Sequence, residues 1–594
     1  MADALPSTAP TAAAGWLRAA DLRRLQTEGQ AVFTGGDRPI VLFHRDGEVF
    51  ALDNRCPHMG FPLSRGTVQD GMVICHWHHA RFDLKSGCTF DPFADDAPAY
   101  ETAVNGKDVF VRPHSGRDAT AYWNRRLREG MQMNVTLVMV KAIHALLGLG
   151  IPPRALAATA GLYGAENRDA FGPGLVILTA MAHTSEMVGS EQAALALAQG
   201  VRAAANDAAG QSPHRTREPL ERDDLDPATA TRWMRRWTAA RHRDGAERTL
   251  LTLLHTGADP ATASDAVFSA ITDRIYADGG HACDFANKAF ELAELVGWPE
   301  GSRRVLPSAV PSFVGSRGAE ESAPWHSPVD LVALLEHAAE AIPGALRDGR
   351  GARWSGDVAA LAWAITGEDA ATIVAVMLEA LRAGATPLQL ATAVAHAGAL
   401  RLARFGTSNE FGDWDTALHT FTYSQAVHHA LARAESPEVL RGVFHGAMSV
   451  YQDRFLNVPP VRLPMAQDTA GLPNNGAEIC AGLLEITSGQ GKVEEAACLA
   501  ARYLELGLDP APLLGALTEA VVREDAAFHT FQMLEAGLRL WRQWDGAPAA
   551  RVPLIAVARY AAAHAPTQRA FAQTVNIVQR LGRGEALHEE AVEG

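Results

Sequence analysis

The sequence is poor in cysteine and has no long apolar runs. Its 594 residues include six cysteines, too few for a disulfide framework. No uninterrupted apolar run reaches about 18 residues, so we expect no membrane span. Asp and Glu number 68 against 53 Lys and Arg, and the net charge of −15 disfavours nucleic acid as a partner. Residues 1–14 lack a basic, apolar leader, which predicts a disordered tail on a cytoplasmic protein.

The remaining chain has two parts with different hydrophobic patterns, and its length allows several domains. Residues 15–113 consist of short alternating runs such as PIVLFHR and GEVFALD, each ended by Gly, Asp or Pro. This period-2 pattern predicts a small all-β domain. Across residues 124–594 apolar residues recur at spacings of three and four, which predicts a large all-α domain. Irregular stretches at 206–229, 299–329 and 457–475 interrupt it, and the second permits a division into subdomains 124–314 and 329–594.

Four weak repeats run through the helical part. Each has a Leu-rich helix, a Gly followed two or three residues later by Pro, and then two more helices; the breaks read GLGIPP, HTGADP, RAGATP and ELGLDP. Such a Gly ends one helix through a left-handed C-cap, and the Pro starts the next helix. The unit is a helical hairpin. Two arrangements remain open, a stacked array and a closed bundle with a site at its centre.

Two cysteines and two histidines form a paired motif in the β domain. Cys56 and His58 are followed, after sixteen residues, by Cys75 and His78. These residues suit a [2Fe–2S] cluster with thiolates on one iron and imidazoles on the other, or a Cys2His2 zinc site. Each half follows a short strand, whereas a zinc finger would need a short helix bearing the histidines. The context therefore favours the cluster.

The segments CPHMGFPLSRG and CHWHHARFDLKSG closely resemble the Rieske ferredoxin family. The resemblance covers about residues 15–113 and implies that the two cysteines hold one iron and the two histidines the other. Phe61 and Trp77 stand where respiratory members have bridging cysteines, so the resemblance is to the ferredoxin or oxygenase type, which receives electrons from a reductase. His76 and His79 are out of ligand register and are expected at the surface or beside the ligands. Cys88 is expected to be a buried small residue.

Three of the helical repeats place a histidine near the start of their third helix. They are His281, His419 and His529, in GGHACDF, ALHTFTY and AFHTFQM. If the repeats close around a common axis, three imidazoles converge there, and such a set suits iron, copper or zinc. The alternative is that each is a core or capping residue. The D/E-x-x-H-x(3 to 4)-H run of common Rieske oxygenases is not evident, so that resemblance stops at the N-terminal domain.

A further metal ligand has several candidates. Asp284 and Glu166 are two of them, and a lysine is a third, although the chain has only five lysines. The helices faintly resemble the questin-oxidase-like family of non-heme iron oxygenases, which implies several histidines and a carboxylated lysine on one iron. By that resemblance Lys141 or Lys288 is the modified ligand, with Lys141 included in our predicted set; a snorkelling surface lysine is the alternative. Tyr423, one turn after the second histidine, is predicted to donate a hydrogen bond in the pocket, unless it is a core residue.

The sequence therefore predicts a small all-β Rieske domain followed by a large all-α domain of repeated helical hairpins. The predicted function is a Rieske-coupled oxygenase, in which a [2Fe–2S] cluster passes electrons to a mononuclear non-heme iron. That iron would activate O2 to oxidise a mostly apolar organic substrate, aromatic compounds included. An external reductase or ferredoxin would supply the electrons, because no nucleotide-binding fingerprint is present, and a homo-oligomer is compatible. The alternative is a non-catalytic electron carrier whose helices form a docking scaffold.

Overall fold

The structure is a computed structural model, and it describes residues 15–36, 38–113, 116, 118–406, 410–544, 547–585 and 587. The predicted tail at 1–14 lies outside the described residues. The chain divides into two compact units. Unit 1 comprises Met1–Gly150 and Ala572–Gly594, and unit 2 comprises Ile151–Phe571.

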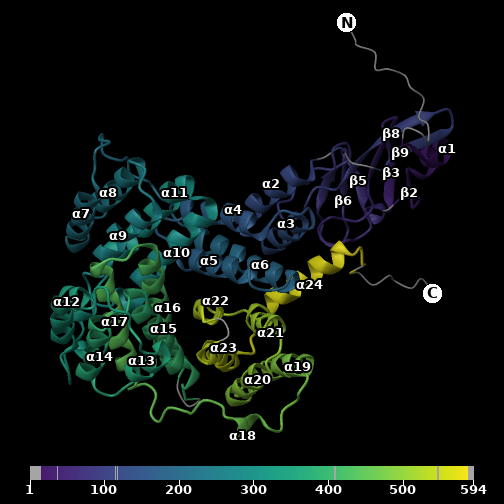
Figure 1. Ribbon diagram of the computed structural model, residues 1–594. Coiled ribbons are helices and arrows are strands. Elements are labelled where there is room, and N and C mark those ends of the chain that lie inside the picture. Colours follow the sequence, from purple (N-terminus) through teal and green to yellow (C-terminus); the bar gives the residue numbers. More distant parts are fainter. Residues whose placement is uncertain are drawn as a thin grey trace. The chain divides into compact units, whose positions relative to one another are not determined.

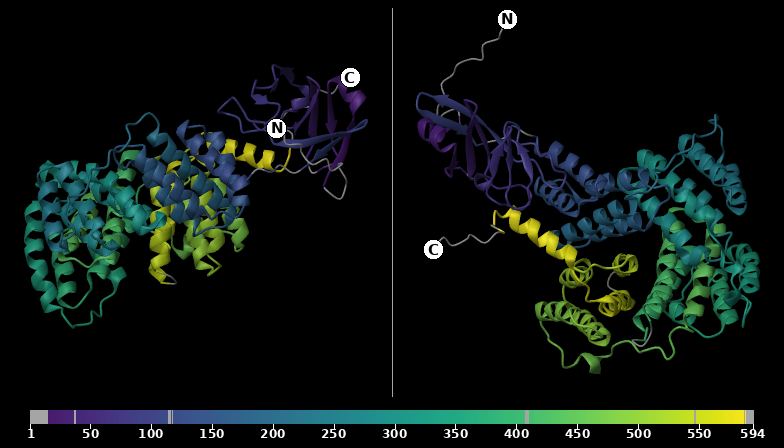
Figure 2. Two further views of the ribbon diagram at one scale, coloured as in Figure 1. Left: turned by 90° about the horizontal axis from the view of Figure 1, so that it is seen from above. Right: turned by 180° about the vertical axis from the view of Figure 1, so that it is seen from behind.

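Unit 1 begins with the predicted β domain, whose strands are purple in Figures 1 and 2. The larger sheet has the antiparallel order β1-β9-β8-β4-β3-β2, and the smaller has the order β5-β6-β7. The strands are β1 (Leu17–Asp21), β2 (Gln30–Phe33), β3 (Ile40–Arg45), β4 (Glu48–Asp53), β5 (Thr67–Gln69), β6 (Met72–Ile74), β7 (Arg81–Asp83), β8 (Ala99–Asn105) and β9 (Asp108–Arg112).

Strand β3 explains how the β domain forms two apolar cores. Successive side chains of a strand point to opposite faces of the sheet. Ile40 and Leu42 enter one core with Val109 and Val111, whereas Val41 and Phe43 enter the other. The second core also contains Cys56 and Cys75. The two motif cysteines are therefore held by the packed interior of the domain.

Unit 1 also contains helices. They are α1 (Leu22–Glu28), α2 (Ala119–Gln132), α3 (Thr136–Gly148) and most of α24 (Ala570–Gly582). Helices α2 and α3 pack against each other. The Tyr122 hydroxyl of α2 accepts a hydrogen bond from the Asp96 N–H at 2.8 Å, which ties this helix to the β domain. The predicted boundary between residues 113 and 124 consequently falls inside unit 1.

Unit 2 is helical, which confirms the predicted fold class. Its helices are α4 (Pro153–Glu166), α5 (Pro173–Ser185), α6 (Ser190–Ala208), α7 (Pro227–Ala239), α8 (Arg243–His255), α9 (Pro260–Ile271), α10 (His281–Val296), α11 (Trp298–Gly315), α12 (Leu331–Asp348), α13 (Val358–Ile365), α14 (Ala370–Arg382), α15 (Pro387–Ala403), α16 (Phe411–Arg433), α17 (Pro437–Asp453), α18 (Ala466–Thr469), α19 (Gly476–Ile486), α20 (Val493–Glu505), α21 (Ala511–Val522), α22 (Phe528–Gln543) and α23 (Arg551–His564).

The four Gly-x-x-Pro breaks have the predicted backbone geometry. The break glycines all have positive φ, at Gly150 (82°), Gly257 (89°), Gly384 (95°) and Gly507 (62°). Helices α4, α9 and α15 begin at a break proline, and Pro510 immediately precedes α21. Glycine adopts the left-handed conformation without the penalty that a Cβ imposes. The helical hairpins of the repeats are therefore present.

The third helices of the four repeats pack in a closed ring. Helix α5 contacts α10 and α22, and α16 contacts the same two helices. Figure 1 shows α10 and α16 side by side in unit 2, and α16 also contacts α22. Of the two arrangements left open by the sequence, these repeats adopt the closed one. Residues on the inner faces of the ring are consequently brought together from distant parts of the chain.

Helix α11 occupies a stretch for which the sequence predicts irregular structure. It contains Pro307 and Pro311 in its interior, where proline removes a backbone N–H and disfavours helix. Its buried face, which includes Val305, Val310 and Phe313, packs on α4, α8 and α10. Tertiary packing therefore outweighs local propensity here. The predicted division between residues 314 and 329 also lies inside unit 2.

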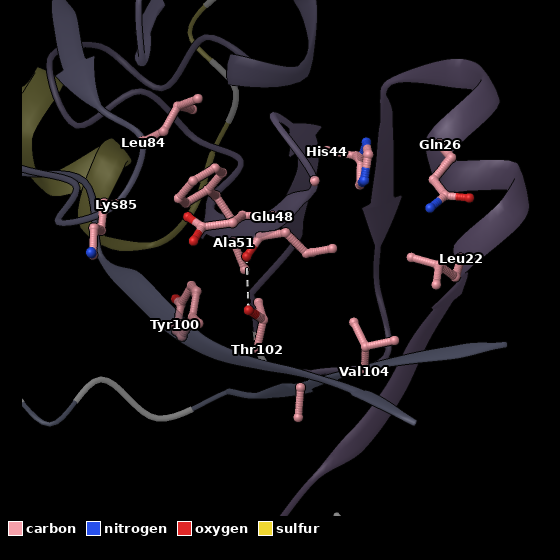
Figure 3. Close-up of a pocket in the computed structure, with 14 residues that line it drawn as sticks. Leu22, Gln26, His44, Glu48, Ala51, Leu84, Lys85, Tyr100, Thr102 and Val104 are labelled. Atoms are coloured by element: carbon pink, nitrogen blue, oxygen red, sulfur yellow. Dashed lines mark hydrogen bonds between the residues drawn. The ribbon is translucent and has the colours of Figure 1, made fainter. Parts of the chain in front are cut away.

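Within the described ranges, no helix is both long and apolar enough to cross a membrane. Unit 1 has a surface groove of about 540 Å³ between α1 and strands β4 and β8 (Figure 3). On its floor the Thr102 hydroxyl donates a hydrogen bond to the Val49 carbonyl at 2.8 Å. The groove lining includes His44, Lys85 and Tyr100 but none of the four motif residues. The groove is thus separate from the predicted cluster site.

Candidate cluster site and candidate metal centre

The two motif loops of unit 1 have the same backbone hydrogen bonds. In each, the cysteine N–H donates to the carbonyl five residues on, and the N–H four residues on donates to the cysteine carbonyl. The bonds are Cys56 N to Phe61 O (2.7 Å), Gly60 N to Cys56 O (2.8 Å), Cys75 N to Ala80 O (2.9 Å) and His79 N to Cys75 O (3.0 Å). Gly60 and His79 both have positive φ, 84° and 60°. His79 thus has the turn position that Gly60 has in the first loop.

The four predicted ligands lie together at the ends of these loops. Cys56 and Cys75 are buried, and their thiols form a hydrogen-bonded pair. The imidazole rings of His58 and His78 are 4.7 Å apart between centroids, at an interplanar angle of 85°. His58 Nδ1 is buried without a hydrogen-bond partner, whereas His78 is exposed. The site therefore has a thiol side and an imidazole side, and the imidazole side reaches solvent.

The local electrostatics favour the metal-binding protonation states of Cys75 and His58, whereas the contact with Cys75 and burial raise the pKa of the Cys56 thiol. The hydrogen bond with Cys56 and the backbone N–H groups of Trp77 and His78 lower the pKa of the Cys75 thiol to about 6. Burial and the nearby Lys141 ammonium lower the pKa of His58 to about 4. Metal ligands must be thiolate and neutral imidazole. Both groups are therefore biased toward their metal-binding forms near neutral pH.

The donor set fits a [2Fe–2S] cluster. Backbone N–H groups of His58 and Met59 are directed at the Cys56 sulfur, as those of Trp77 and His78 are at the Cys75 sulfur. Both histidines lie in turns instead of the short helix that a zinc finger would use. Two thiolates would hold one iron and two imidazoles the other. The fold and the paired loops therefore define an electron-transfer domain of the Rieske class.

Comparison with known proteins agrees. Residues 15–101 match the Rieske [2Fe-2S] domain family, and the chain belongs to this family through that domain. The 3-phenylpropionate/cinnamic acid dioxygenase ferredoxin subunit of Shigella boydii is 34% identical over 86 residues, which are 14% of this chain and 81% of that protein. Human apoptosis-inducing factor 3 is 30% identical over 150 residues, 24% of this chain and 23% of that protein. The ferredoxin of carbazole 1,9a-dioxygenase from Nocardioides aromaticivorans is 24% identical with a TM-score of 0.16, covering 17% of this chain and 98% of its own.

We expect His78→Cys to retain a [2Fe–2S] centre with a lower reduction potential. A thiolate places more negative charge on the outer iron than a neutral imidazole does, and the potential should fall by roughly 0.1 V or more. A redox titration monitored by visible circular dichroism measures the change in reduction potential. The cluster assignment would be wrong if wild-type protein purified without oxygen contained zinc and had no visible chromophore.

Residues around the motif show one correction. His76 is exposed and its Nε2 lies 2.7 Å from the Thr67 hydroxyl, in agreement with a surface role. Phe61 and Trp77, at the positions of the bridging cysteines, face each other at 6.2 Å between ring centroids. Cys88, expected to be buried, is exposed because it follows the tight turn at Gly87.

The second candidate site lies in unit 2, where three predicted ligands converge. His281 is the first residue of α10, His529 is the second of α22, and His419 lies two turns into α16. One ring nitrogen from each lies within 4.8 Å of the others, and the Nε2 atoms of His419 and His529 are 2.8 Å apart. All three are half-buried. The closed ring of repeats therefore brings together histidines that are up to 248 residues apart, a separation given by the numbers 281 and 529.

The turn before His281 allows α10 to approach α16 closely. Gly279 and Gly280 both have positive φ, 62° and 98°. A Cβ on Gly280 would lie 3.0 Å from the Tyr423 Cβ and 3.3 Å from the His419 carbonyl oxygen. Only glycine combines this conformation with so close a contact. The GGH triplet is therefore a sequence signal for the placement of His281 beside His419.

Asp415 orients one of the histidines and was missed by the sequence analysis. Its Oδ2 lies 3.2 Å from His529 Nδ1, and the Tyr560 hydroxyl donates a hydrogen bond to its Oδ1. Burial alone would raise the pKa of Asp415, but the contacts with His529 and Tyr560 outweigh it and lower the pKa. A carboxylate on the far nitrogen of a metal-binding imidazole fixes its tautomer and orientation. Asp415 lies one turn before His419, and its i, i+4 spacing is the only signal in the sequence.

The histidine cluster favours neutral imidazoles. Burial, followed by the neighbouring His281 and His529, lowers the pKa of His419 to about 3. Burial also lowers the pKa of His281. Phe285 and Phe528 pack on the ring of His281, with centroids 5.3 Å and 6.1 Å away. The cluster thus offers unprotonated nitrogens on a partly apolar surface.

Lys141 has its hydrogen-bond partners within its own unit. It belongs to unit 1, where its ammonium group contacts the carbonyl oxygens of Pro57 and His58. The role predicted for Lys141 as a ligand of the helical metal stays a prediction. Glu166, another candidate, is bound by Arg304.

Tyr423 is directed into the core and does not point toward the three histidines. Its ring packs on Tyr276 at 4.9 Å, and its hydroxyl lies against Gly442 of α17. Burial raises its pKa well above the ordinary value. Tyr423 therefore has the core placement that was the alternative to the predicted pocket hydrogen bond.

A second polar group lies deeper in the ring of third helices. The carboxylates of Glu291 and Glu535 approach His183, and their oxygens could geometrically hold a cation. Two cations of the chain already occupy that position: Lys288 contacts Glu291 at 2.9 Å and Glu535 at 2.8 Å, and Arg539 contacts them at 2.5 Å and 2.9 Å. Asp284 lies beside this group and accepts a hydrogen bond from Gln532. The group is a buried ion network, and Lys288 is a part of it.

Proposed function

We propose that the chain is a Rieske-coupled non-heme iron oxygenase. Cys56, His58, Cys75 and His78 hold its [2Fe–2S] cluster, and His281, His419 and His529 hold a mononuclear iron. The observation that supports the second site is the convergence of three imidazoles from equivalent helices of three repeats, with a ring nitrogen of each within 4.8 Å of the others. Imidazole nitrogens suit iron among the common transition metals.

Residues of both units would have separate roles in this activity. The exposed ring of His78 provides an edge at which electrons from a separate reductase or ferredoxin enter or leave the cluster. Asp415 holds His529 in one orientation, and Phe285 and Phe528 offer an apolar surface for an organic substrate. When bound, the iron supplies the site at which O2 is activated. The substrate is therefore proposed to be mostly apolar, with aromatic compounds as one class.

The second candidate is a non-catalytic electron carrier whose helices dock a partner enzyme. The observation that favours it is the similarity to a dioxygenase ferredoxin subunit, of which the chain covers 81%. In this case the three histidines are packing residues of the bundle. Electron transfer then requires only unit 1.

Iron stoichiometry separates the two functions. Full-length protein purified without oxygen should contain about two irons and two acid-labile sulfides if it is a carrier, and one further iron without sulfide if it is the oxygenase. If the protein is a carrier, the chemically reduced chain should form no product from aromatic test compounds in the presence of O2. A chain that reaches only two irons after reconstitution with excess Fe(II) would reject the oxygenase.

A further inference from the structure

Lys141 contacts the ligand loop of the cluster site from a helix outside the matched Rieske residues 15–101. Its side chain extends from α3, and its Nζ donates hydrogen bonds to the carbonyl oxygens of Pro57 and His58 at 2.5 Å and 2.7 Å. These carbonyls belong to the loop between Cys56 and Gly60. All of these residues lie in unit 1.

The contact is part of a buried charged group. Lys141 is 9% exposed, and its Nζ lies 3.4 Å from Asp95 Oδ2. Asp95 Oδ1 in turn accepts a hydrogen bond from Arg126 Nε at 2.9 Å, and both of these residues are buried. Burying a charged group is unfavourable unless it is paired and hydrogen-bonded. Lys141 has an ion-pair partner and two carbonyl acceptors, so the fold provides a built place for the ammonium.

Among the buried charged groups beside the loop, two cations share one carboxylate. Lys141 and Arg126 share Asp95 as their buried carboxylate, while Arg126 also reaches the half-exposed Glu129. The net charge, hydrogen bonding and solvent exposure around an iron–sulfur cluster set its reduction potential. A nearby positive charge favours the reduced cluster because reduction adds an electron. The screening is weak because the ammonium is enclosed by protein.

We propose that Lys141 is a positioning residue of the Rieske domain, which fixes the Cys56–His58 loop and raises the reduction potential of the cluster. The helix that supplies it follows the β domain in the chain, so the Rieske domain and α3 form one redox unit. This role depends only on the cluster in unit 1 and is independent of any metal in unit 2.

The test uses the full-length, cluster-loaded chain and two substitutions with opposite expected signs. In Lys141→Gln, which keeps a hydrogen-bond donor and removes the charge, the ratio of reduced to oxidised cluster at a fixed solution potential should fall about tenfold, equal to 59 mV for one electron. In Asp95→Asn the ratio should rise, because the carboxylate charge is removed while an acceptor for Arg126 remains. Redox titration followed by electron paramagnetic resonance gives both ratios.

Two controls separate charge from packing. Lys141→Arg keeps the charge and should stay within about threefold of the wild-type ratio. Lys85→Gln removes an exposed lysine on the rim of the groove in Figure 3 and should leave the ratio unchanged, because water screens its charge. A purely structural role for Lys141 would lower iron and sulfide content without moving the ratio, and this result would overturn the proposal. If Lys141→Gln does not fold, Asp95→Asn decides: a raised ratio supports the proposal and an unchanged or lowered one rejects it.

Discussion

Replacing His419 by alanine is expected to remove the proposed iron from unit 2 and to leave the Rieske spectrum unchanged. His419 lies between the other two histidines, with ring centroids 4.4 Å from His281 and 4.7 Å from His529. Its loss leaves two imidazoles and should weaken iron binding by more than the roughly 10–100-fold that loss of an outer hydrogen bond costs. Iron per chain, with cluster absorption as internal standard, measures the effect.

Two further variants make this result specific. Asp415→Asn keeps the size of the side chain and should weaken iron binding by about 10–100-fold, less than loss of the ligand itself, because His529 loses its carboxylate partner. His445→Ala removes another buried imidazole, on α17 near Arg441 and Asp273, and should lower stability without changing iron content. Equal iron content in His419→Ala, His445→Ala and wild type would reject the three-histidine site.

The features that the sequence predicted well depend on short stretches of chain. The cluster loops follow from residues within the two CxH and CxxH segments, and the same backbone hydrogen bonds recur in both. The repeat breaks follow from a glycine and a proline three residues apart, which fix a helix end and a helix start. The convergence of His281, His419 and His529 was inferred only through the repeats, since equivalent positions meet when repeats close on an axis.

The features that the sequence did not predict depend on contacts between distant residues. Lys141 contacts the Pro57 carbonyl 84 positions away in the chain, and no sequence pattern near either residue predicts this contact. Helix α11 forms despite its two interior prolines because its buried face packs on neighbouring helices, chiefly α4, α8 and α10. Lys288 and Glu535 pair across 247 positions of the chain, and the packing of the third helices in a ring brings them together.

That ion network gives the largest expected effect on stability. Glu291 and Glu535 are buried, and both contact Lys288 and Arg539. Burial alone would raise the pKa of Glu291, but Arg539 and Lys288 outweigh it and hold the pKa well below its ordinary value; the pKa of Glu535 is lowered in the same way. Both carboxylates are therefore charged at neutral pH and depend on the two cations.

Lys288→Met is expected to destabilise the protein by about 3–5 kcal/mol near pH 7, because it leaves buried carboxylates with one cation between them. The matched control is Lys492→Met, which removes an i, i+3 pair with Glu495 at the surface and should cost at most about 1 kcal/mol. Urea unfolding, monitored by far-ultraviolet circular dichroism, gives the free energy of unfolding of both variants.

The direction of the pH dependence is also fixed: wild type loses the stability that the two carboxylates contribute as pH falls below about 4.5 toward their lowered folded pKa values. In the variant these pKa values rise, protonation relieves the uncompensated charge, and the difference from wild type should narrow between pH 7 and pH 5. A Lys288→Met deficit no larger than that of Lys492→Met, or one that grows on acidification, would show that the network does not stabilise the ring of helices around the candidate metal site.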